Sequence, residues 1–138
     1  MLKSARLCLL AACTTAAATV LVGCGSGGEP VSDICKVSDA LSSAVTQINQ
    51  TPLSKSSTAA VEASLATVNA ALTDLDKVED SEFQKEMDAV KTSGAELNKT
   101  VGAAIDAPTP ANNAAGRDSM ADFTTQVNAL ASSTNDSC

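Results

Sequence analysis

Cysteine thiols are the side chains of this sequence with the clearest chemistry. The 138-residue chain has five Cys and no His, Trp or Tyr. Without His the chain lacks the commonest general base and the commonest metal ligand. Without Trp and Tyr it lacks the rings on which nucleic-acid bases usually stack. The chemistry to expect is therefore that of thiols, which is the attachment of a group or the formation of a disulfide.

Cys24 ends the stretch Leu21-Val22-Gly23-Cys24, which follows a short basic and apolar leader. Lys3 and Arg6 open this leader, and residues 7–22 carry no charge. The apolar run is shorter than the roughly 20 residues of a membrane span. A basic start, a short apolar run and a small-residue cleavage site are typical of a secretory signal. An ordinary signal peptide with an incidental cysteine, or an uncleaved anchor, is the alternative.

The stretch from Leu21 to Cys24 resembles the lipobox of bacterial lipoproteins, and the leader looks actinobacterial in type. The resemblance implies that Cys24 carries palmitate-like acyl chains and becomes the first residue of the mature protein. Because one acyl chain anchors only marginally, stable tethering requires more than one. The resemblance implies an extracytoplasmic protein at the cell membrane. It covers only residues 1–30, and the body resembles no family that we recognise.

The mature chain divides into a short tether and one small domain. We expect residues 1–23 to be the signal peptide, 24–31 a flexible Gly/Ser-rich tether and 32–138 the domain. Residues 24–138 hold seven basic and sixteen acidic residues, a net charge of −9. Such an acidic body argues against nucleic acid as a partner, because phosphates require basic patches. It also argues against electrostatic docking on anionic lipid.

Cys35 and Cys138 remain once Cys24 is assigned to lipid and the leader is removed. An even pair in an exported protein indicates a disulfide, and two free cysteines are the alternative. A disulfide closing a loop of about 100 residues stabilises by about 4.7 kcal/mol in the chain-entropy model.

Apolar residues recur at helical spacing in four blocks, which span 34–48, 61–78, 83–105 and 120–130. Pro52 ends the first block, and Pro108 and Pro110 separate the last two. Ser81 and Gln84 predict a capping box for the third helix. We predict an all-α, up-down-up-down four-helix bundle. In that topology Cys35 and Cys138 meet at one end.

Three further groups of residues could form sites, and each has a structural interpretation. The acidic link lacks the glycine and terminal glutamate of a calcium loop, so charge at a helix start explains it better. Met87 and Met120 lie at core spacing, which favours packing over metal binding. Gly94 and Gly102 could line an apolar pocket, although tight packing is the simpler interpretation. The acidic link comprises Asp74, Asp76, Glu79, Asp80 and Glu82.

These observations predict a non-enzymatic interaction module, tethered to the membrane and docking on an unidentified envelope protein. The alternative is a carrier that holds an apolar ligand between its helices. We expect no catalytic residue, no cofactor and no metal. An internal cavity would favour the carrier, whereas an exposed apolar stripe would favour docking.

Overall fold

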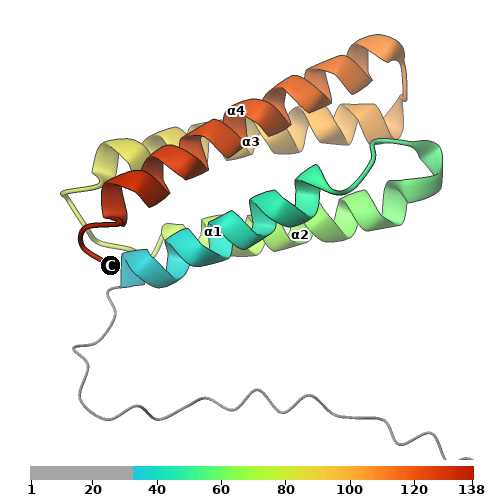
Figure 1. Cartoon of the computed structure of the whole chain (residues 1–138). Helices are drawn as coiled ribbons and strands as arrows, with labels where there is room; N and C mark the ends of the chain where they lie inside the picture. Colours follow the sequence, from blue (N-terminus) through green and yellow to red (C-terminus); the bar gives the residue numbers. More distant parts are fainter. Residues whose placement is uncertain (1–32) are drawn as a thin grey trace, which may run out of the picture.

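The computed structural model describes residues 33–138, and these residues form a bundle of four α-helices (Figure 1). The predicted signal peptide, the lipobox with Cys24, and the tether lie outside the described residues. The helices are α1 Asp33–Asn49, α2 Thr58–Leu75, α3 Gln84–Asp106 and α4 Pro110–Thr134, with a short 3₁₀ turn, η1 Lys55–Ser57, before α2. No strand occurs among the described residues. The all-α prediction is confirmed.

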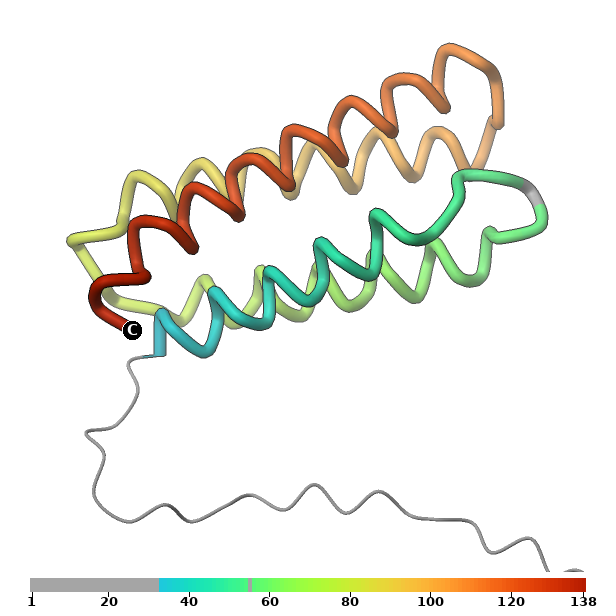
Figure 2. Tube along the Cα trace, viewed as in Figure 1, coloured from blue at the N-terminus to red at the C-terminus, as the bar shows by residue number. Residues whose placement is uncertain are grey.

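Successive helices alternate in direction, as the colour gradient in Figure 2 shows. Two contacts fix the register of α1 against α4. The Cys35–Cys138 disulfide joins them at one end, and Asn49 Nδ2 donates to Thr124 Oγ1 at 3.0 Å further along. Between these contacts the chain advances fourteen residues in α1 and goes back fourteen in the C-terminal segment. The two segments are therefore antiparallel and packed along their length.

The register of α2 against α3 follows in the same way. The Asn69 and Asn98 side-chain amides donate to each other's oxygen atoms at 3.1 and 2.7 Å. Lys91 Nζ lies 3.0 Å from Asp76 Oδ1. From the first contact to the second, α2 advances seven residues and α3 goes back seven. The two helices are antiparallel, and Leu65 consequently lies level with Gly102.

The core is mostly aliphatic and also holds the rings of Phe83 and Phe123. Phe123 of α4 is fully buried, as are Met87 of α3 and Leu41 of α1. Met120 is also buried, so the prediction that both methionines pack in the core is confirmed. The other fully buried large side chains come from all four helices: Ile34, Ile48, Leu75, Leu97, Leu130, Val61, Val68, Val90 and Val101.

Two helix boundaries differ from those expected. The capping box is wrong, because α3 starts at Gln84 after Phe83 and no side chain caps it. Gln84 Nε2 instead donates to Asp88 Oδ1 at 2.8 Å. Helix α4 begins ten residues before the apolar block that predicted it. Thr109 Oγ1 accepts from the Asn112 N–H at 3.1 Å, and Pro110 stands at the first helical position, where its missing N–H costs nothing.

Candidate functional site

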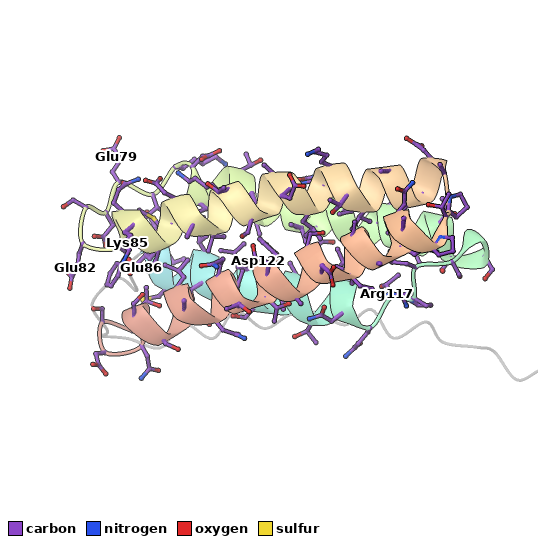
Figure 3. All side chains as sticks on the ribbon, turned by 90° about the horizontal axis from the view of Figure 1, so that it is seen from above. Glu79, Glu82, Lys85, Glu86, Arg117 and Asp122 are labelled. Carbon is purple, nitrogen blue, oxygen red and sulfur yellow. A yellow bond between two sulfur atoms is a disulfide. The ribbon has the colours of Figure 1, made fainter. Side chains whose placement is uncertain are left out.

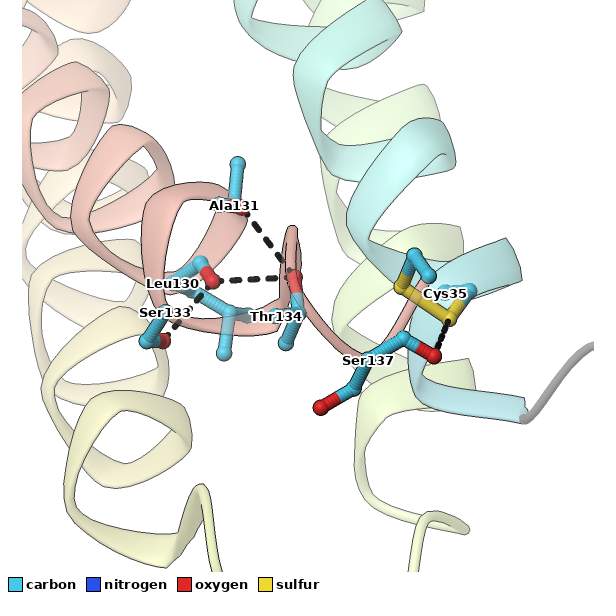
Figure 4. The surroundings of a disulfide bond; sticks show 7 residues. Cys35, Leu130, Ala131, Ser133, Thr134 and Ser137 are labelled. Atoms are coloured by element: carbon cyan, nitrogen blue, oxygen red, sulfur yellow. Dashed lines mark hydrogen bonds between the residues drawn. A yellow bond between two sulfur atoms is a disulfide. The ribbon is translucent and has the colours of Figure 1, made fainter.

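The first candidate site is the end of the bundle where the chain enters α1. Cys35 and Cys138 form a disulfide there, with Cα atoms 5.7 Å apart across 103 residues of sequence (Figure 4). Cys35 is 4% exposed, and its Sγ lies 3.9 Å from the carbonyl oxygen of Ser137. Thr134 nearby is buried and donates to the Leu130 carbonyl at 3.0 Å. The predicted pairing is confirmed, and it closes the start of α1 onto the end of the chain.

The acidic link between α2 and α3 lies at this same end, where Figure 3 shows Glu79, Glu82 and Glu86 together with Lys85. Its three aspartates have local partners. Asp74 pairs with Lys77 at 2.8 Å. Asp80 Oδ1 accepts from the Glu82 N–H at 3.0 Å. Asp76 bridges to Lys91 of α3. These contacts give the carboxylates a structural role in ending α2 and starting α3.

Within residues 33–138 no group of three His, Cys, Asp or Glu side chains is placed to hold a metal ion. Many Ser and Thr hydroxyls in this part of the chain donate hydrogen bonds to backbone carbonyls of their own helix. Thr46 and Thr92, for example, each donate to the carbonyl four residues earlier, at 3.0 and 2.8 Å. Across the described part, every fully buried side-chain N or O atom has a hydrogen-bond partner. The helices therefore leave no buried polar group aimed at an absent ligand.

Gly94 and Gly102 occur eight residues apart on the side of α3 that faces α2, but their surroundings differ. A Cβ built on Gly94 would stand 2.6 Å from Leu72 Cδ1 and 3.4 Å from Phe123 Cε2. The expected close approach at Gly94 is confirmed. A Cβ built on Gly102 would meet no atom within 4 Å, so open space lies there.

Most residues on the side of α2 turned away from the other helices are small, uncharged and exposed. We call this side the α2 outer face. Glu62 is the one charged residue from Thr58 to Thr73, and it lies at the edge of this face, three residues after Ala59 and four before Ala66. The members of the face recur in the sequence at three- and four-residue spacing. Because they are small, a search for large apolar residues does not find them. The α2 outer face comprises Ala59, Ala63, Ala66, Ala70 and Thr73.

A second distinctive surface is the contact line between α2 and α3, which we call the α2–α3 seam. Leu65 and Leu72 of α2 are only half-buried there, and so is Ile105 of α3. Leu53, from the link between α1 and α2, reaches the far end of the seam, where a hollow of about 10 Å³ is lined by Leu53, Val61, Ala104 and Ile105. The seam thus leaves apolar surface partly open to solvent.

The other hollows of the described residues lie on the surface. One of about 280 Å³ separates the start of α1 from the end of α2, with Val37 and Val78 on its floor and the ion pairs Lys36–Asp33 and Lys77–Asp74 at its rim. Leu, Ile, Val, Met and Phe side chains are all buried or half-buried in the described part. Neither a large enclosed apolar cavity nor a fully exposed stripe of large apolar residues is therefore present there.

None of the helices in residues 33–138 is both long enough and apolar enough to cross a bilayer. The chain matches no protein-family model, no curated protein and no solved structure.

Proposed function

We propose that the protein is a membrane-tethered, non-enzymatic interaction module of the bacterial cell envelope. Acyl chains on Cys24 hold it on the extracytoplasmic face of the cell membrane, and the helical bundle docks on an envelope protein. The support for tethering is the leader and the resemblance of residues 21–24 to a lipobox. The support for docking is the surface of the bundle.

The α2 outer face is the observation that carries the docking proposal. Residues 33–138 hold fifteen acidic residues, yet Glu62, at the edge of this face, is the one charged residue from Thr58 to Thr73. The centres of protein interfaces are depleted of charged residues, because a charge must lose its water on binding. Small side chains also let the axis of a partner helix come close. A docked helix would therefore lie along Ala59, Ala63, Ala66 and Ala70.

Site-specific photo-crosslinking in native membranes tests this proposal. A benzophenone amino acid is placed at Ala66 on the α2 outer face or at Ala129, an exposed alanine of α4, as a matched control. We expect a discrete protein adduct from position 66 that is missing from position 129. Equal adducts from both positions, or adducts with lipid alone from position 66, would contradict docking through this face.

The carrier remains a second candidate, and the α2–α3 seam is the observation that favours it. The seam has the half-buried apolar side chains of Leu65, Leu72 and Ile105 and open space at Gly102. Ligand sites are apolar and concave, and helical bundles form them between helices. Organic extraction of the purified full-length protein, followed by mass spectrometry, tests the candidate. A stoichiometric apolar compound supports it, and an extract that matches the one from membranes without the protein opposes it.

A further inference from the structure

The four contact lines of the bundle are not equally strong. α2 and α3 have the sparsest packing of the four neighbouring pairs, whereas α3 and α4 have the densest. The α1–α4 line, on the opposite side, is closed covalently by Cys35–Cys138. Regions with few apolar contacts open at lower free energy than the rest of a fold. The bundle is therefore built to part between α2 and α3 while α1 and α4 hold it together.

The α2–α3 seam has apolar side chains that can move apart. Leu72 and Leu65 are half-buried and pack against the edge of the core, so both side chains must turn outward when a group enters the seam. The register set by Asn69 and Asn98 brings Leu65 level with Gly102, beside which a Cβ would have no neighbour within 4 Å. The room for an added group is thus on the α3 side of the seam.

The seam has charged residues at both of its ends. Glu62 of α2, seven residues before Asn69 and exposed, comes level with Ile105 at the end away from the disulfide. Lys91 faces α2 at the end near the disulfide, where its side chain is 31% exposed and its ammonium lies 3.0 Å from Asp76, which is 65% exposed. The next positions of α3 on this side are uncharged. They are Gly94, Asn98, Gly102 and Ile105.

We propose that the α2–α3 seam binds a single long hydrocarbon chain that ends in a carboxylate. The carboxylate pairs with Lys91, and the exposed Asp76 side chain turns to solvent. The tail runs past Gly94 and Gly102 towards Ile105, in the place that Leu72 and Leu65 vacate. From Lys91 to Ile105 the helix rises about 21 Å at 1.5 Å per residue. One leaflet of a bilayer core is about 15 Å deep, so the seam accommodates a chain of membrane length.

This inference rests on the carrier candidate and names its ligand class. It is tested with the full chain carrying Cys24→Ser, which has no lipid anchor, and with cis-parinaric acid, a linear fluorescent fatty acid, and its methyl ester. Gly102→Leu fills the open space of the seam. Ala103→Leu is the control, because it places a leucine at the neighbouring residue, which is exposed. Both changes are compatible with the helix, because leucine is a strong helix former, and circular dichroism checks folding.

We expect Gly102→Leu to weaken binding of the acid about tenfold or more, equivalent to about 1.4 kcal/mol, and Ala103→Leu to leave it within about twofold. Binding to the apolar leader instead of the seam would be equally insensitive to both changes. Equal affinities of the two variants would therefore overturn the proposal.

The contact between the ligand carboxylate and Lys91 is tested by Lys91→Met, with Lys99→Met as control. Lys99 also lies on α3 but pairs with Glu96 of its own helix at 3.3 Å. A hydrogen bond to a charged group is stronger than one between neutral groups, so Lys91→Met is expected to weaken binding of the acid about tenfold or more and to leave binding of the ester unchanged. We expect Lys99→Met to leave the binding of both the acid and the ester unchanged.

The outcomes separate this inference from the carrier function. If the probe binds but Gly102→Leu and Lys91→Met have no effect, the assigned site is wrong and a carrier function persists elsewhere on the chain. If neither the acid nor the ester binds and extraction yields no apolar compound, both the site and the carrier function are wrong. Acid and ester binding equally tightly would overturn the carboxylate assignment.

Discussion

Leu72 of α2 lies directly over Gly94 of α3, where a Cβ on residue 94 would stand 2.6 Å from Leu72 Cδ1. Phe123 of α4 is close to the same position, since its Cε2 would be 3.4 Å from that Cβ. Gly94 is buried, and its missing side chain leaves the room in which Leu72 packs against the core.

Alanine at the two seam glycines should have unequal effects. In a helix, Gly→Ala raises the free energy of unfolding by about 0.4–1 kcal/mol. At Gly102 the new methyl group meets nothing, so we expect that gain in full. At Gly94 it forces Leu72 to move, and overpacking costs about 1–3 kcal/mol. Urea unfolding followed by circular dichroism should find Gly94→Ala less stable than Gly102→Ala by at least about 1 kcal/mol. Equal stabilisation by both would contradict the observed packing at Gly94.

The core position of Gly94, the four helices and the disulfide can be predicted from the sequence. Each follows from the spacing of residues along the chain or from the number of cysteines. Gly94 falls at a core position between Val90 and Leu97. The Cys35–Cys138 pairing follows from a count of thiols and from a topology that brings both to one end. The periodicity of the apolar residues and the even number of cysteines that follow Cys24 are enough to predict such features.

The first part of α4 could not be predicted from large apolar residues, because Gly116 and Ser119 make its contacts. A Cβ on Gly116 would stand 3.1 Å from Leu53 Cδ1, and the Ser119 hydroxyl bonds to that of Thr100. Which small residue faces the core depends on the neighbouring helices. The openness of the α2–α3 seam is a tertiary property of the same kind, set by how closely two helices approach.

Thr109→Ala should destabilise the protein by about 1 kcal/mol, the typical cost of losing an N-cap. The Thr109 hydroxyl oxygen accepts from the Asn112 N–H and satisfies one of the free donors at the start of α4. Thr125→Ala is the control, because Thr125 is exposed within α4 and alanine is the better helix former. Urea unfolding should show a loss for the first variant only. A loss of the same size in both would mean that the cap contributes nothing specific.

Removing the disulfide should lower the free energy of unfolding by about 2–5 kcal/mol. The double substitution Cys35→Ser and Cys138→Ser frees a loop that spans nearly the whole domain. Urea unfolding of this variant is compared with the wild-type protein, and the wild-type protein is also measured under reducing conditions as a second route to the same state. Peptide mapping without reductant should recover residues 35 and 138 in one linked fragment. Recovery of both residues as alkylated thiols would contradict the pairing.

Replacing Cys24 by Ser should release the protein from membranes, because serine cannot carry the thioether-linked lipid of a lipoprotein. None of the described helices is long and apolar enough to span a bilayer, and an acidic surface is repelled by anionic lipid. Fractionation should move the protein from the membrane pellet to the soluble fraction. Cys35→Ser is the matched control, because it removes a different thiol and leaves the lipid. A Cys24→Ser protein that stays in the pellet after a high-salt wash would mean that the leader itself is the anchor and that residues 21–24 are not a lipobox.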